Sequence, residues 1–138
     1  MNKNEKLSEH FTLGEMTATS QPFDNTPGAI ALENLRTLCK QLETIRAKVG
    51  RPLRISSGFR SAKVNKAVGG STYSHHRYGN AADIFCGQDL GLAVDVMNAA
   101  MTTDYAECIL SQRGQNYWVH YAYDELSTQH YASMRIYS

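Results

Sequence analysis

The stretch Ser74-His75-His76-Arg77-Tyr78-Gly79-Asn80-Ala81-Ala82-Asp83 places a histidine and an aspartate, His76 and Asp83, seven positions apart. Along one extended strand two such residues would be about 23 Å apart. Two ligands of one zinc ion need donor atoms about 2 Å from the metal, so a shared site requires the chain to reverse between them. Gly79-Asn80 permits that reversal because both residue types tolerate positive φ, and Ala81-Ala82 is small enough for close backbone packing.

A metal site would also need a third ligand from elsewhere in the chain. The β-branched and aromatic run 117–123 has a period of two and predicts a strand with His120 between Trp118 and Ala122, on a face that looks buried. The other face carries Tyr117, Tyr121 and Tyr123, which indicate strand packing, with a sugar- or partner-stacking surface as the alternative. A histidine in an apolar strand is more often a hydrogen-bonded core residue than a ligand. The residues alone therefore leave both a metal site and a metal-free interaction domain open.

The surrounding sequence predicts one α+β domain over residues 1–138, with helices packed on a mainly antiparallel sheet. Apolar periodicity predicts helices over 27–49, 62–68 and 89–101, and strands over 52–56, 108–110, 117–123 and an edge strand at 134–136. The first helix ends at Gly50. The helix over 89–101 carries its apolar side at Leu90, Val94, Met97 and Met101.

The charge balance, the cysteines and the N-terminal segment indicate which classes of protein this chain can belong to. Lys plus Arg number 14 and Asp plus Glu number 13, and this near-neutral balance argues against a nucleic-acid-binding protein. Cys39, Cys86 and Cys108 are an odd number without CxxC spacing, which predicts reduced core thiols and cytoplasmic synthesis. The segment Met1–Met16 has no apolar run that would serve as a signal peptide or membrane span. No unexplained apolar face demands a partner, so we expect a monomer.

The pattern Ser74-x-His76-x-x-Gly79-x-Ala81-x-Asp83, with Trp118-Val119-His120 further along, resembles the zinc-dependent D-Ala-D-Ala carboxypeptidases and phage endolysin-like peptidases of family M15. The resemblance extends to Leu7–Met16 and to Ile55–Ser61, with Asn65 and Val68-Gly69-Gly70. It implies the small α+β fold shared with the Hedgehog signalling domain. It also implies a zinc ion held by three ligands, His76, Asp83 and His120. His75 would only flank these ligands.

The resemblance assigns roles to two further residues. Two imidazoles and one carboxylate leave a fourth position open, as in catalytic zinc sites, where water is activated. Arg60 matches a family arginine that binds a substrate carboxylate or the developing oxyanion, a task suited to its planar fork. Ser74 would either hydrogen-bond the substrate or cap its loop.

Hydrolysis also requires a group that accepts and returns a proton. Several branches of the family place an acidic residue where this chain has Tyr117, and another branch places one where it has Ser111. Glu107 is the remaining candidate for the general base, although it lies four strand residues, about 13 Å, from Ser111. Tyr117 or Tyr78 would be alternative hydrogen-bond donors.

The resemblance implies a zinc metallopeptidase that cleaves peptidoglycan stem peptides of the bacterial cell wall at a D-amino-acid bond. The alternative keeps the zinc and the fold but binds peptidoglycan or a protein partner without cleaving it, and the missing carboxylates favour this alternative. A wall-cleaving domain without an export signal resembles an endolysin, which reaches the wall after lysis or by a phage route.

Overall fold

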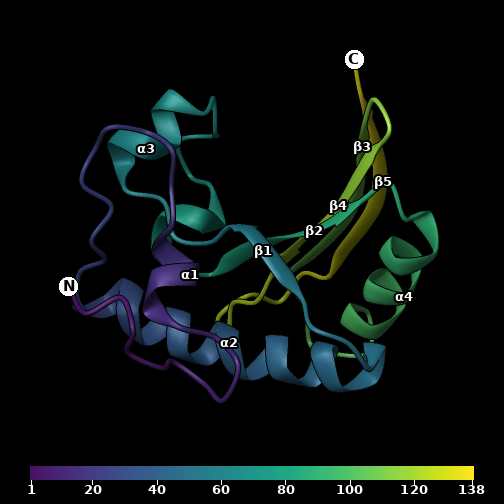
Figure 1. Ribbon diagram of the computed structural model, residues 1–138, viewed down its shortest axis with the longest axis horizontal. Helices are drawn as coiled ribbons and strands as arrows, with labels where there is room; N and C mark the ends of the chain where they lie inside the picture. Colours follow the sequence, from purple (N-terminus) through teal and green to yellow (C-terminus); the bar gives the residue numbers. More distant parts are fainter.

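The computed structural model describes residues 1–138 as a five-stranded sheet with its helices beside it (Figure 1). The helices are α1 (Leu13–Thr17), α2 (Ala29–Val49), α3 (Ala62–Ala67), the 3-10 helix η1 (His75–Tyr78) and α4 (Leu90–Ala100). The strands are β1 (Arg54–Ser57), β2 (Ala81–Gly87), β3 (Glu107–Arg113), β4 (Asn116–Ala122) and β5 (Tyr131–Tyr137). Their order in the sheet is β1-β2-β4-β3-β5, and only β3 and β5 run parallel. The predicted α+β class with a mainly antiparallel sheet is confirmed.

One face of the sheet packs against α2 and α4 to form the core. The leucines and isoleucine of the predicted α2 stripe, including Leu35, Leu42 and Ile45, are fully buried. Tyr121 of β4 is also fully buried in this core, and its hydroxyl lies 2.7 Å from the Thr103 hydroxyl. Tyr117 and Tyr123 are half-buried and pack against the same core, so the tyrosine face of β4 is a packing face.

Helix α4 corrects one expectation. Its buried side is formed by small residues, Ala93, Val96 and Ala100, while Leu90 and Val94 are 49% and 41% exposed. Small side chains allow the helix to lie close to the sheet. The stripe of small residues therefore faces inward in place of the stripe of larger apolar residues.

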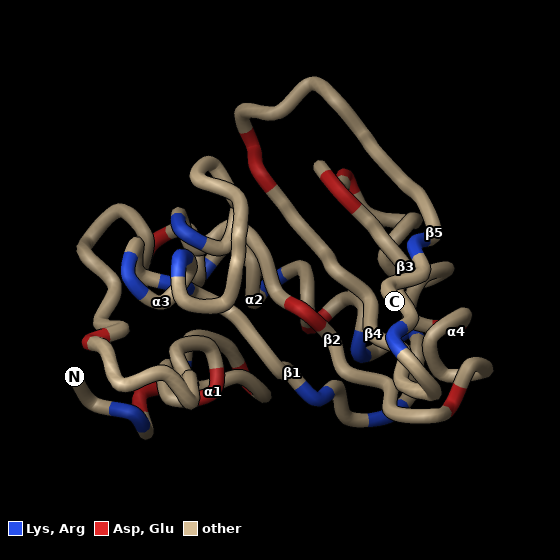
Figure 2. Tube along the Cα trace, turned by 90° about the horizontal axis from the view of Figure 1, so that it is seen from above, with Lys and Arg blue, Asp and Glu red and all other residues tan.

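The three cysteines are free and buried, as expected. Burial raises the pKa of the Cys39 and Cys108 thiols to about 12, so both stay neutral and unreactive. Acidic and basic positions are interspersed along the chain (Figure 2). None of the helices combines the length and apolar character needed to cross a bilayer.

Glu43 of α2 fastens the N-terminal segment to the helix layer. Its Oε2 accepts hydrogen bonds from the Ser8 hydroxyl at 2.6 Å and the His10 backbone N–H at 2.7 Å, and its Oε1 lies 2.7 Å from His10 Nδ1. Partial burial opposes ionisation, but these hydrogen bonds lower the pKa of Glu43 below its ordinary value of 4.5. The ionised carboxylate therefore stabilises the fold.

We expect Glu43→Gln to lower the free energy of unfolding by about 1–2 kcal/mol at pH 7, because the bonds to a charged acceptor are lost. The lowered pKa means that this contribution is present above pH 4.5 and disappears as the pH falls through the folded-state pKa. Urea unfolding at pH 7 and near pH 4 checks this, with exposed Glu33→Gln on the same helix as control. A difference that does not shrink on acidification would contradict it.

Candidate metal centre

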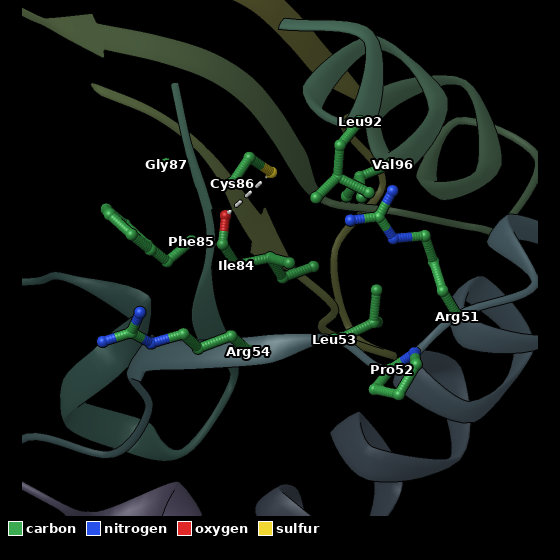
Figure 3. A pocket seen from close by; sticks show the side chains of 10 residues that line it. All are labelled: Arg51, Pro52, Leu53, Arg54, Ile84, Phe85, Cys86, Gly87, Leu92 and Val96. Carbon is green, nitrogen blue, oxygen red and sulfur yellow. Dashed lines mark hydrogen bonds between the residues drawn. The ribbon is translucent and has the colours of Figure 1, made fainter. Parts of the chain in front are cut away.

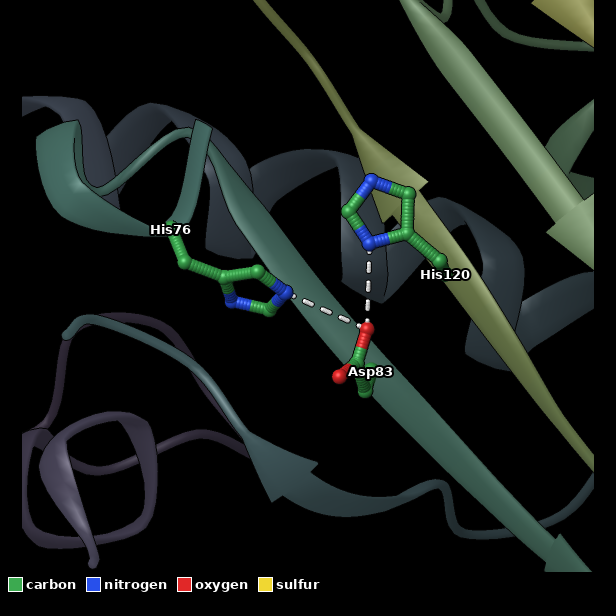
Figure 4. A group of neighbouring side chains, drawn as sticks. All are labelled: His76, Asp83 and His120. Carbon is green, nitrogen blue, oxygen red and sulfur yellow. Dashed lines mark hydrogen bonds and ion pairs between the residues drawn. The ribbon is translucent and has the colours of Figure 1, made fainter. Parts of the chain in front are cut away.

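Three elements bring the candidate ligands together: His76 comes from η1, Asp83 from β2 and His120 from β4 (Figure 4). Strands β2 and β4 pair so that Asp83 lies directly opposite His120. The predicted reversal is the turn after η1, where Gly79 adopts φ 76°. A Cβ at Gly79 would collide with the backbone oxygen of Ala31 in α2, so glycine allows η1 to lie against that helix.

The spacing of the donor atoms fits a tetrahedral zinc site. Asp83 Oδ1 lies 3.2 Å from His76 Nε2 and 3.1 Å from His120 Nδ1, and the three donor atoms lie within 4.8 Å of one another. Ligands about 2 Å from a tetrahedral ion are about 3.3 Å apart. The metal-ligand set expected from the sequence is therefore assembled with little movement required.

Both imidazoles are oriented by their second nitrogen. His76 Nδ1 lies 2.7 Å from the Gly58 carbonyl, which can only accept, so Nδ1 is protonated and Nε2 is the nitrogen turned to Asp83. His120 Nε2 lies 3.0 Å from Glu107 Oε1 and leaves Nδ1 for the site. Partners of this kind fix the ring orientation and the tautomer of metal-binding histidines.

The charges in the site hold Asp83 as a carboxylate. Burial opposes its ionisation, but the charge of His76 and hydrogen bonds from both histidines lower the pKa of Asp83 well below its ordinary value. Burial also disfavours the charged form of His120, but Asp83 and Glu107 together raise its pKa to about 9. A metal ion that takes His120 Nδ1 must therefore displace a proton.

Arg60 lies beside Oδ2 of Asp83, the carboxylate oxygen that is not turned to the histidines. Its Nη2 lies 3.3 Å from Asp83 Oδ2, and its Nε donates to the Ser57 hydroxyl at 2.9 Å. Burial lowers the pKa of Arg60, and Asp83 opposes that shift. The expected substrate-binding arginine thus also supports a ligand, which its sequence position did not reveal.

We expect Arg60→Gln to weaken zinc binding about 10- to 100-fold, the usual effect of removing a partner of a ligand. Competition of the protein with a chromophoric zinc chelator measures this. Arg51→Gln, an exposed arginine whose nearest carboxylate is Asp89 at 3.9 Å, is the matched control. Unchanged affinity in Arg60→Gln would show that Arg60 does not support Asp83.

Glu107 lies much closer to the ligands than the strand-length estimate from Ser111 indicated. The partner of His120 across the β3–β4 pair is Ile109, so Glu107 is only two residues along β3 on the same face. Its Oε1 also lies 2.8 Å from His75 Nδ1. Hydrogen bonds from His120 and His75 lower the pKa of Glu107 well below its ordinary value. His75 flanks the ligands, as expected, and contacts them through this carboxylate.

Of the other residues that the sequence singled out, some lie at the cleft beside the metal ligands and others do not. Ser74 Oγ accepts the backbone N–H of His76 at 3.2 Å, so its capping role is seen directly, and Ser74 also lines the cleft described next. Tyr117 and Tyr78 do not line that cleft, and neither is placed to act there. Ser111 does line it.

The candidate metal site opens into a cleft of about 800 Å³ on the sheet face opposite α2 and α4, bordered by η1 and the turn after α3. His120 and Trp118 line this cleft, so the face of β4 that looked buried from its sequence is partly open to solvent, with His120 17% exposed. Among the residues that line the cleft, only Asp83 and Glu107 are acidic. A ligand can therefore reach the side of the site away from the core.

A second cavity of about 270 Å³ lies between β1, β2 and α4 (Figure 3). It is lined mainly by apolar side chains such as Leu53, Ile84 and Val96, with Arg51 and Arg54 beside them. No histidine or carboxylate lines it, so it offers neither a ligand set nor a proton acceptor.

An α+β fold with two histidines and one aspartate converging on an open cleft defines a metallohydrolase-type site. The comparisons make this assignment specific: the family model for peptidase M15 matches residues 9–122, and this chain belongs to that family. Over 81 residues it is 32% identical to a zinc D-Ala-D-Ala carboxypeptidase from Streptomyces albus G, covering 56% of this chain and 32% of that protein. The chain thus spans about a third of that relative's length. Zinc, the expected cofactor, agrees with this relationship and with the donor set.

Proposed function

We propose that this protein is a zinc-dependent peptidase that hydrolyses a peptide bond, next to a D-amino acid, in the stem peptides of bacterial peptidoglycan. The observation that carries the proposal is the convergence of His76, Asp83 and His120 at the wall of an open cleft. Three protein ligands with an accessible fourth side are typical of catalytic zinc and not of structural zinc. The substrate class is supported by the name of the Streptomyces relative.

The three ligand residues would hold the ion, which when bound supplies a Lewis acid for the peptide carbonyl and lowers the pKa of water. His76 and Asp83 are held in place by Gly58 and Arg60 before any substrate arrives. Such preorganisation removes a reorganisation cost at the moment of reaction.

Glu107 is the proton acceptor in this proposal. Once Asp83 is assigned to the ion, Glu107 is the only carboxylate left among the residues that line the cleft. Its Oε1 accepts hydrogen bonds from His120 Nε2 and His75 Nδ1, while its Oε2 forms no hydrogen bond within the protein. That second oxygen is free to take a proton from the attacking water and to deliver it to the leaving amine.

Arg60 provides the positive charge beside the reacting group. Three of its N–H groups are used by Ser57, Asp83 and Asn65, and a guanidinium has five. The remaining donors serve either a substrate carboxylate or the developing oxyanion. Ser74 borders the same cleft and is the proposed hydrogen-bond partner for the peptide backbone.

The alternative function is a zinc-containing module that binds peptidoglycan or a protein partner without cleaving it. One observation favours it: neither position at which the family's branches place the acidic residue, Tyr117 or Ser111, is acidic in this chain. The peptidase function therefore requires that Oε2 of Glu107 takes a proton from water in place of the missing acidic residue.

Digestion of defined muropeptides decides between the two functions. The zinc-loaded protein is incubated with monomeric and cross-linked stem peptides, and the products are identified by mass spectrometry. Loss of a terminal residue identifies a carboxypeptidase, and splitting of a cross-link or an internal bond identifies an endopeptidase. Saturable binding with every substrate intact would establish the binding module.

A further inference from the structure

The cleft extends from the metal ligands along the open face of the sheet to a second group of side chains, which we call the arginine–aromatic cluster: Phe85, Arg113, Trp118, Arg135 and Tyr137. The sheet register places these residues on the ligand side. Phe85 follows Asp83 by two residues on β2, and Trp118 precedes His120 by two on β4. On the neighbouring strands, Arg135 pairs with Ser111 and Tyr137 pairs with Arg113.

The side chains of the cluster are stacked on one another. The rings of Trp118 and Tyr137 lie 5.5 Å apart at an interplanar angle of 22°. The guanidinium carbon of Arg113 is 4.9 Å from the centre of the Tyr137 ring. Arg135 is 5.9 Å from the same ring and donates to its hydroxyl at 3.2 Å. Stacking on an aromatic face restricts a guanidinium while leaving its N–H groups available.

The two arginines lack an anionic partner within the protein. Neither Arg113 nor Arg135 forms an ion pair, and the acidic residues of the cleft, Asp83 and Glu107, lie at the other end and are held by histidines. Basic positions on β3 and β5 are visible as blue segments in Figure 2. The cleft therefore has a metal-binding end and an unpaired cationic end.

We propose that the arginine–aromatic cluster is a subsite that binds a free carboxylate on the substrate peptide, separated from the scissile bond by two to four residues. This inference rests on the proposed peptidase function and specifies its substrate as an acidic peptide. Arg113 and Arg135 supply the bidentate donors, and Trp118 with Tyr137 packs against the peptide beside that carboxylate.

The separation follows from the strand geometry. Trp118 is two residues from His120, about 7 Å, and Arg113, opposite Asn116, is four residues along, about 13 Å. An extended peptide covers about 3.3–3.6 Å per residue, so these distances correspond to two to four residues. The terminal carboxylate of a carboxypeptidase substrate is only one residue from the scissile bond and falls short of the cluster. An internal acidic residue of the stem peptide reaches it.

Two of the five residues of the cluster lie outside the family match. Arg135 and Tyr137 lie on β5, whereas the peptidase M15 model ends at residue 122. Edge strand β5 pairs in parallel with β3 and brings both side chains beside Arg113 and Trp118. The proposed preference for an acidic peptide thus depends in part on residues that the family model does not cover.

A matched pair of synthetic stem peptides tests the subsite, one with a free carboxylate at its internal acidic residue and the other with a carboxamide there. Trp118 is the only tryptophan of the chain, so its fluorescence reports binding on rapid mixing with zinc-loaded protein, before turnover. We expect the free-acid peptide to bind at least about tenfold more tightly, the difference that loss of a charge-assisted hydrogen bond produces. The preference for the internal free acid should persist when both peptides are also amidated at the C-terminus, because the terminal carboxylate does not reach the cluster.

The double variant Arg113→Gln and Arg135→Gln should bind both peptides equally, while Arg51→Gln keeps the preference. Arg135→Gln alone, at an exposed edge position, should lose part of the preference and guards against misfolding of the double variant. Equal binding by the unmodified protein, or a preference that survives the double variant, would overturn the proposal. A binding preference without hydrolysis would leave the subsite intact and refute the peptidase, and hydrolysis without preference would do the reverse.

Discussion

His120→Ala is expected to abolish both zinc retention and peptide hydrolysis. Removing one of three ligands leaves His76 and Asp83 alone, so zinc affinity should fall by more than the roughly 10- to 100-fold loss seen when only a partner of a ligand is removed. Hydrolysis should drop at least about 1,000-fold because the ion's Lewis acidity is lost with it. Metal analysis after dialysis, and product formation from stem peptides, measure the two effects.

The control is His130→Ala, since His130 lies outside the cleft, where its ring hydrogen-bonds the Tyr105 carbonyl and lies edge-on to the Tyr105 ring. Circular dichroism should show that both variants keep the fold. Full zinc retention in His120→Ala would mean that this histidine is not a ligand.

Glu107 gives the second large effect, and two substitutions separate its two tasks. Glu107→Gln keeps an oxygen that accepts from His120 Nε2 but cannot take a proton from water. It should lower kcat about 100- to 10,000-fold with less than a tenfold change in zinc affinity. Glu107→Ala removes the acceptor as well, and should also weaken zinc binding about 10- to 100-fold.

Steady-state kinetics and chelator competition on both variants separate the two tasks, with exposed Asp95→Asn on α4 as the matched charge control. If Glu107→Gln retains kcat, Glu107 is a positioning residue for His120 and another group handles the proton.

The local part of the site could be predicted from the sequence because it depends on a short segment. The Gly79-Asn80 reversal and the His76-to-Asp83 spacing are properties of adjacent residues, and the structure realises both. The distance from Glu107 to His120 depends instead on how β3 is aligned with β4. A sequence gives the faces of a strand but not its register, so the carboxylate was placed too far from the ligands.

There are also physical reasons why the sequence did not predict strand β2, helices α1 and η1, and the buried side of α4. Strand β2 carries Asp83 on one face and Ala82 and Ile84 on the other, but Ala81 and Phe85 make both faces largely apolar, so no alternation marks it as a strand. The helices α1 and η1 span only five and four residues, too few for a periodic signal. In α4, apolar residues occur on two sides, and only the contact with the sheet selects the alanine side.

The most direct test of the account is hydrolysis measured while zinc is added back to metal-free protein. We expect release of product from a stem peptide to rise linearly with zinc and to stop rising at one equivalent, when the site formed by His76, Asp83 and His120 is full. Tight uptake of one equivalent without any hydrolysis, or hydrolysis that is the same without zinc, would contradict the assignment as a zinc peptidase.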